Sequence, residues 1–290
     1  MAPPPTSTLP LTERVKKLAQ TLQFAWFLGH LTLLLSVIRY LFSYITFNFY
    51  SRWAQTSYRL AFVAAAATYG IVVYKAYKAR LNTGAKQQSA LMLAADENVQ
   101  YLLMALIWLY SRQIPLALLP FTVYSIFHVA TYTRTNIIPT FQPPKSAPSG
   151  GTPSSPNSPK PSSSQSPLAN SIGKFVKEYY DASMTLVALL EIGLWFRVLL
   201  SAFTFTKGSW VLLIIYSVFL RARYAQSQFV QGAFAQAIAR VDAQVQNQSM
   251  PPAVRQGWET VKGLGRKGVE ATDLRRYLGG SNQQGTKKPQ

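Results

Sequence analysis

Apolar and polar positions fall in long blocks along the chain, and the block Tyr101–Arg134 shows the pattern most clearly. Its two apolar runs, Tyr101–Tyr110 and Ile114–Thr131, are separated by a polar triplet, Ser111, Arg112 and Gln113. A helix needs about 20 residues to cross a bilayer core of about 30 Å, so the first run is too short and the second is marginal. The pattern predicts a membrane hairpin. Two buried helices of a soluble core are the alternative.

Two prolines locate the bend of this hairpin. Pro115 follows the polar triplet directly, and the residue before a proline disfavours helical angles. We therefore expect the bend near Gln113 and Ile114. Pro120 either kinks the second arm or marks its first turn.

Four further apolar runs accompany the hairpin: Leu22–Ile45, Tyr58–Tyr74, Met184–Phe205 and Trp210–Leu220. The second is rich in alanine, which permits close helix contact, so we expect it to pack against its neighbours. Short arms recur beside long ones, and the number of true spans is four to six. The sequence predicts an all-α, polytopic helical membrane protein with short membrane hairpins and C-terminal amphipathic helices.

The candidate intramembrane charged residues are Arg39, Glu191 and Arg197. Arg39 is near the end of its run, where its side chain can reach the interface. An intramembrane carboxylate is costly, so Glu191 raises the hypothesis of a proton or substrate relay. The alternatives are a structural pair with Arg39 or Arg197, or a protonated carboxyl group.

Residues 142–171 are rich in Pro, Ser and Gly and contain almost no apolar residue, which predicts a disordered linker. Its Ser-Pro pairs, among them Ser155-Pro156 and Ser166-Pro167, are candidate sites of proline-directed phosphorylation. A neutral spacer is the other interpretation.

Two amphipathic patterns follow the last apolar run. The first, over 222–248, predicts a helix that Pro251 and Pro252 end. The second lies in the tail, where Val254, Trp258, Val261, Leu264 and Gly265 share one face. Basic residues line its polar side, and its glycines suggest folding only on contact with lipid or a partner.

A weakly hydrophobic helix of this kind is typical of binding to an anionic membrane surface. The candidate membrane-binding residues are Arg255, Trp258, Val261, Lys262, Leu264, Arg266 and Lys267. The alternatives are a solvated helix packed on the protein and a Lys/Arg-rich stretch read by an import receptor. Nucleic acid is a weaker choice, because no recognisable nucleic-acid-binding fold is present.

Charge supports a membrane protein and orients it. Only 13% of residues are charged, where soluble domains have about 25%, and the net charge is +19. Most basic residues outside the runs fall on the side of the N-terminus, so both termini are expected in the cytosol. The first twenty residues contain no apolar stretch of a signal peptide.

These patterns divide the chain into six parts. We expect a cytosolic N-terminal segment (1–21), a membrane region with the central hairpin (22–141) and the linker (142–171). A second membrane region (172–220), an amphipathic helix (221–250) and a basic tail (251–290) follow.

Residues for catalysis are scarce. The sequence has no cysteine, its two histidines, His30 and His128, lie far apart in apolar arms, and no recognised catalytic or phosphate-binding motif occurs. We expect no catalytic, cofactor or metal site, and a hydrogen-bonded structural role for His128.

The string Ser125-Ile-Phe-His128-Val-Ala130-Thr131-Tyr132-Thr133-Arg134 resembles the signature of the transmembrane protein 33 family, whose fungal members include pore membrane proteins of the nuclear envelope. The similarity extends over about residues 10–248 without the linker. The resemblance implies residence in the endoplasmic reticulum and nuclear envelope, and contact with reticulon-type shaping proteins and nucleoporins. It also implies a part in nuclear pore distribution or tubule organisation, and no catalytic site.

The physical pattern fits that role. Short hairpins and an interfacial helix would add area to one leaflet and favour curved membrane. Two other functions stay open: a transporter or lipid-moving protein that uses Glu191 and His128, and a passive scaffold whose tail recruits an import receptor.

Overall fold

The computed structural model describes residues 9–82, 93, 95–142, 166–247 and 250–272, and within these ranges the regular structure is helical. The chain divides into two compact units, residues 1–194 and 195–290. The expected all-α fold is confirmed. Most of the predicted linker and the tail beyond Thr272 lie outside the described residues.

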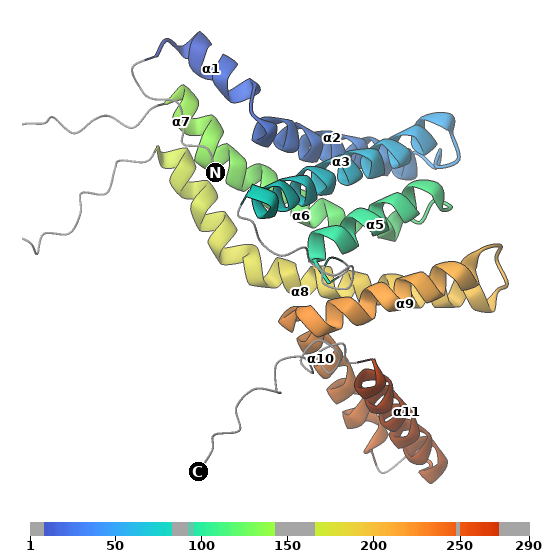
Figure 1. The fold of residues 1–290 in the computed structure, drawn as a ribbon. Coiled ribbons are helices and arrows are strands. Elements are labelled where there is room, and N and C mark those ends of the chain that lie inside the picture. The colour runs from blue at the N-terminus through green and yellow to red at the C-terminus, as the bar shows by residue number, and fades with distance from the viewer. Residues whose placement is uncertain (1–8, 83–92, 94, 143–165, 248–249, 273–290) are drawn as a thin grey trace, which may run out of the picture. The chain divides into compact units, whose positions relative to one another are not determined.

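The first unit begins with the short helix α1 (Leu11–Ala19). Two antiparallel helices follow, α2 (Leu22–Ile45) and α3 (Arg52–Asn82), drawn side by side in Figure 1. Thr21 begins α2, because its hydroxyl accepts a hydrogen bond from the Phe24 N–H at 3.1 Å. The alanines of α3 allow the two helices to approach closely: Ala54, Ala61, Ala64 and Ala65 are all buried. The expectation that this helix packs on its neighbours is confirmed.

Helices α5 (Glu97–Tyr110) and α6 (Leu118–Tyr132) form the predicted central hairpin. A 3₁₀ turn (Pro115–Ala117) joins the bend to α6, so the bend lies where the sequence placed it. Pro120 falls in the first turn of α6, where a proline costs no helical hydrogen bond.

Side chains of α3 satisfy the backbone at this bend. The Tyr58 hydroxyl accepts a hydrogen bond from the Ile114 N–H at 3.1 Å and donates one to the Ile114 carbonyl oxygen at 3.4 Å. The Arg59 guanidinium donates to the carbonyls of Trp108, at 3.2 Å, and Leu109, near the end of α5. The hairpin is thus attached to α3 by hydrogen bonds as well as by apolar contact.

The second arm of the hairpin is longer than its apolar run suggests. A π-helix (Thr133–Ile137) and α7 (Ile138–Phe141) continue α6, and together they make a 27-residue span from Pro115. Threonine hydroxyls keep the polar end helical by donating to carbonyls one turn back, as Thr135 does to Thr131 at 2.9 Å. The interpretation of this arm as marginal in length was wrong for that reason.

Helix α8 (Pro167–Phe203) begins earlier than expected, inside the predicted 142–171 linker. Ser166 caps its first turn by accepting from the Ala169 N–H at 3.3 Å, and Pro167 occupies the first helical position. Ser166-Pro167 is therefore a helix start. The sequence missed it because Ser-Pro pairs also fill the preceding stretch.

The second unit holds the end of α8, from Trp195, and helices α9 (Ser209–Gln226), α10 (Gln228–Val245) and α11 (Pro252–Ala271). Gly208, with a φ of 75°, allows the tight turn before α9. The single helix predicted over 222–248 is wrong at its start. Helix α9 runs through Gln226, and Ser227 then caps α10 by accepting from the Val230 N–H.

Among the described residues, four helical segments are long and apolar enough to cross a bilayer: Leu22–Ile45, Arg52–Asn82, Pro115–Phe141 and Pro167–Phe203. This number is the lower end of the predicted range. Helices α5, with 14 residues, and α9, with 18, are the short arms beside them.

A substitution at Gly29 of α2 tests the close contact of α2 and α3. A Cβ at Gly29 would clash with Thr68 Cγ2, and Thr68 is held by a hydrogen bond from its hydroxyl to the Ala65 carbonyl at 2.8 Å. We predict that Gly29→Ala destabilises the protein by about 1–3 kcal/mol and lowers its thermal unfolding midpoint in detergent. Gly70→Ala is the control, because a Cβ there meets nothing within 4 Å. An equal or higher midpoint for Gly29→Ala would contradict this packing.

Candidate functional site: a basic amphipathic helix

Helix α11 carries an apolar face that the described residues of its unit leave exposed. Val254, Val261 and Leu264 are 44%, 57% and 64% exposed, although they lie on one side of the helix. Arg266 and Lys267 are exposed beside them. The expected amphipathic helix is therefore present, and it ends near Ala271.

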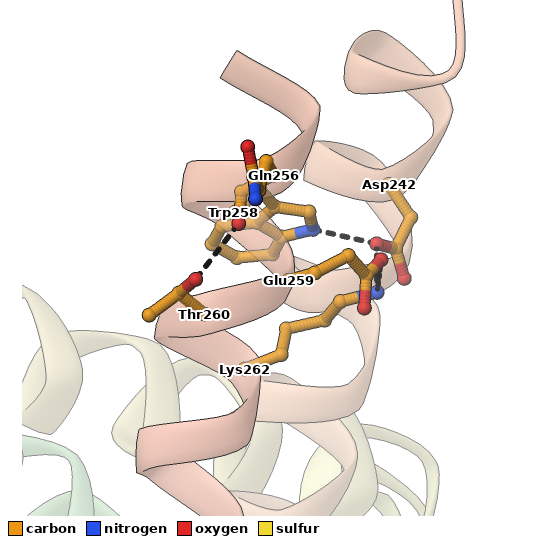
Figure 2. Close-up of polar contacts among 6 residues, drawn as sticks. All are labelled: Asp242, Gln256, Trp258, Glu259, Thr260 and Lys262. Atoms are coloured by element: carbon orange, nitrogen blue, oxygen red, sulfur yellow. Dashed lines mark hydrogen bonds and ion pairs between the residues drawn. The ribbon is translucent and has the colours of Figure 1, made fainter. Parts of the chain in front are cut away.

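The edge of this face is fastened to α10 (Figure 2). Asp242 Oδ1 accepts hydrogen bonds from Trp258 Nε1 at 2.6 Å and from Lys262 Nζ at 2.8 Å. Lys262 also pairs with Glu259 one turn away, at 2.7 Å. We call Asp242, Trp258, Glu259 and Lys262 the clamp.

Arg221 of α9 holds the other end of α11. Its Nε donates to Thr272 Oγ1 at 2.6 Å, and its Nη2 donates to the Val269 carbonyl at 2.9 Å. A cation at a helix C-terminus is favourable, because the last carbonyls have no partner within the helix. These contacts offset part of the cost of the four glycines in α11.

The clamp shifts the pKa of both charged partners. Hydrogen bonds from Lys262 and Trp258 lower the pKa of Asp242 below its ordinary 3.8. Hydrogen bonds to Asp242 and Glu259 raise the pKa of Lys262 above 10.5. The stability that Asp242 contributes is therefore complete above pH 3.8 and is lost as pH falls through its lowered pKa. The Lys262 contribution is lost only as pH rises through its raised pKa.

The structure separates the seven candidate membrane-binding residues into two groups. Trp258 and Lys262 turn toward α10, and Arg255 donates to the Asn247 carbonyl at 3.1 Å. Val261, Leu264, Arg266 and Lys267 stay exposed. Sequence reasoning missed Asp242 and Arg221, because the helical repeat of α11 carries no information on which residues of other helices meet it.

The Ser125–Arg134 string lies on α6 and the π-helix, where it packs on other helices of the first unit. Ser125 Oγ is hydrogen-bonded to His30 Nδ1 of α2 at 2.9 Å, and the Tyr132 ring stacks on Phe27 with centroids 4.7 Å apart. Arg134 packs against Gly173 of α8, where a Cβ would lie 2.7 Å from the guanidinium carbon. Ala130, Thr131 and Thr133 belong to the same helical stretch.

The two histidines, far apart in sequence, are neighbours in space. The rings of His30 and His128 have centroids 4.7 Å apart, and Trp26 meets both at 4.5 and 4.8 Å. The hydrogen bond expected for His128 is observed instead for His30. A histidine on one helix gives no signal about the opposite helix, so the sequence could not predict this pair.

Glu191 is 1% exposed, and its carboxylate accepts a hydrogen bond from the Tyr101 hydroxyl. The Tyr124 hydroxyl lies 3.3 Å from that of Tyr101 and donates to Glu97 at 3.5 Å. Neither proposed arginine partner is needed, because Arg39 donates to Ser43 and Arg197 to Ser201, each on its own helix. Within the described residues, no three His, Asp or Glu side chains gather into a metal site.

The sequence pattern of the family described as transmembrane protein 33/nucleoporin POM33 matches residues 5–267. The chain belongs to this family. The match covers α10 and most of α11, as far as Lys267, whereas the resemblance from the sequence covered about residues 10–248. No solved structure matches the chain.

Three relatives are similar over most of their length. Nucleoporin POM33 of Chaetomium thermophilum is 52% identical over 280 residues, which cover 96% of each chain. Tetra-spanning protein 1 of Schizosaccharomyces pombe is 31% identical over 264 residues, 90% of this chain and 89% of the relative. Pore membrane protein of 33 kDa of Saccharomyces cerevisiae is 29% identical over 262 residues, 87% and 85% of the two chains.

The clamp predicts that the docking of α11 depends on Asp242. Asp242→Ala removes the acceptor of both Trp258 and Lys262, so α11 should undock and its amides should exchange hydrogen several-fold faster in the full chain. Asp242→Asn keeps an acceptor for Trp258, so its α11 amides should exchange at a rate between those of the wild type and of Asp242→Ala. In the wild type, protection should weaken only below about pH 4, as the sign of the Asp242 shift requires. Equal exchange in all three chains would show that the clamp does not hold α11.

Proposed function

We propose that this chain is a non-enzymatic membrane protein of the nuclear envelope and endoplasmic reticulum that stabilises curved membrane, at the nuclear pore rim and in tubules. The names of its relatives support the pore, since two are a nucleoporin and a pore membrane protein. The observation that carries the proposal is the exposed apolar face of α11 beside Arg266 and Lys267.

That face has the composition of a membrane-binding surface. Val254, Val261 and Leu264 can enter the boundary of headgroups and acyl chains, while the basic residues remain at the anionic surface. Each basic residue near such a surface contributes about 1 kcal/mol. Because the clamp and Arg221 keep α11 helical before contact, binding does not have to include the full cost of folding. This differs from the expectation that the tail folds only on lipid.

The short arms support the same function. A 14-residue helix such as α5 extends about 21 Å, less than a bilayer core of about 30 Å. Helices that enter one leaflet without crossing both add area to one side of the membrane, and an amphipathic helix bound at the membrane surface has the same effect. We place the termini and the Ser/Pro linker, with its candidate phosphorylation sites, in the cytosol, in accordance with the distribution of basic residues.

The partners that fit this role are anionic lipids, reticulon-type shaping proteins, nucleoporins and, for the basic tail, an import receptor. Glu191 and His128 lie among packed helices, where Glu191 meets Tyr101 and His128 meets Trp26. In a scaffold role, the apolar face of α11 would bind a protein partner. The following experiment distinguishes that role from membrane binding.

The absence of cysteine from the sequence permits a clean labelling test. We predict that a spin label at Val261→Cys, in the full chain in vesicles with anionic phospholipid, is accessible to oxygen and protected from a water-soluble nickel chelate. Glu270→Cys is the matched control, because it lies nine residues along α11 and so on the opposite side. The label at this position should be accessible to the chelate.

Equal access of the chelate to both labels would place α11 away from the bilayer. The apolar face would then belong to a protein partner, and the membrane-shaping role of the tail would be rejected.

A further inference from the structure

An arginine faces the protein interior at the start of the first unit. Helix α1 (Leu11–Ala19) is amphipathic, and Arg14 lies on the same side as Leu11, Val15 and Leu18. Arg14 is only 9% exposed, although it is always ionised. Its neighbours Lys16 and Lys17 are exposed, as basic residues of a surface helix usually are.

Two of the three nitrogens of the Arg14 guanidinium lack an acceptor among the described residues. Arg14 Nε and Nη1 are both inaccessible and have no hydrogen-bond partner. A buried charge without a partner is among the most costly features in a protein, and arginine presents its N–H groups in a fork that fits carboxylate and phosphate oxygens. The geometry therefore calls for an anion at this position.

Helix α1 packs beside α7, as Figure 1 shows, and it also contacts α2. Neither of these two described helices contains an acidic residue. Near α7, Thr140 donates to the Asn136 carbonyl at 2.7 Å and Asn136 donates to Thr135 at 2.8 Å. On α1 itself, Glu13 is exposed and makes no ion pair with Arg14.

The position of Arg14 indicates where an anion would come from. Helix α1 ends at Ala19, just before the span Leu22–Ile45 begins, and α7 is the end of the span Pro115–Phe141. Two span ends therefore flank the guanidinium, which puts it at the depth where phospholipid headgroups lie. Arg134 also belongs to this end of the unit.

We propose that Arg14 binds the phosphate group of a phospholipid between α1 and α7. Bound phosphate compensates the buried charge and ties α1 to the surface of the membrane. The site is separate from α11, so it stands or fails independently of the proposed function.

The test uses the full chain, purified in detergent until a phosphorus assay detects no phospholipid. Thermal unfolding is followed with phosphatidylglycerol, with diacylglycerol of the same acyl chains, and with inorganic phosphate. Arg14→Leu removes the guanidinium and keeps an apolar side chain. Lys17→Leu is the control, because Lys17 is an exposed cation on the same helix.

Phosphatidylglycerol should raise the unfolding midpoint of the wild type and of Lys17→Leu, and diacylglycerol should not. Arg14→Leu should be at least as stable as the wild type without phospholipid, because it removes an unpaired buried charge. It should gain little from phosphatidylglycerol, with an apparent affinity at least about tenfold weaker. If inorganic phosphate raised the unfolding midpoint as much as phosphatidylglycerol does, the site would belong to a free anion. If inorganic phosphate left the midpoint unchanged, the site would belong to the lipid.

Two results would overturn the proposal. One is an Arg14→Leu chain that is less stable than the wild type without phospholipid, which would mean that the guanidinium already has a partner. The other is the same phosphatidylglycerol increment in both chains. Arg14→Gln, which keeps a polar side chain, repeats the comparison if Arg14→Leu does not fold.

Discussion

Hydrogen bonding of backbone groups inside the apolar layer is the constraint on which the first unit depends. A membrane hairpin must turn, and the turn exposes carbonyls and N–H groups that water cannot reach. Tyr58 and Arg59 of α3 supply the missing partners at the α5–α6 bend. Because these side chains come from another helix, the hairpin cannot form its bend independently of α3. The short length of α5 is therefore compatible with a defined position in the membrane protein.

The same requirement accounts for other polar residues of the spans. Ser125 meets His30, Glu191 meets Tyr101, and Arg39 and Arg197 reach hydroxyls on their own helices. Each contact provides a hydrogen bond where an isolated polar group would be costly. The family string thus has a packing role in this structure, since its members join α6 to α2 and the π-helix to α8. A relay is not required to explain these residues.

Sequence patterns predicted the kind and order of the helices, because hydrophobic runs and prolines act locally. The bend before Pro115, the alanine contact of α3 and the amphipathic helix α11 were all readable in this way. Helix ends were less predictable, since single caps such as Ser166 and Ser227 decide them. Contacts between distant residues, such as Asp242 with Trp258, could not be predicted at all. They depend on how helices meet in space, and a helical repeat reports only on one helix.

We propose that this chain favours curved membrane through its short arms and the preformed amphipathic helix α11. The most direct measurement is the density of the labelled full chain on a membrane tube pulled from a giant vesicle, relative to the density on the vesicle itself. The account predicts enrichment on the tube that rises as the tube narrows, and weaker enrichment for Leu264→Asp, which places a charge on the exposed face of α11. Equal density on tube and vesicle at every radius would contradict it.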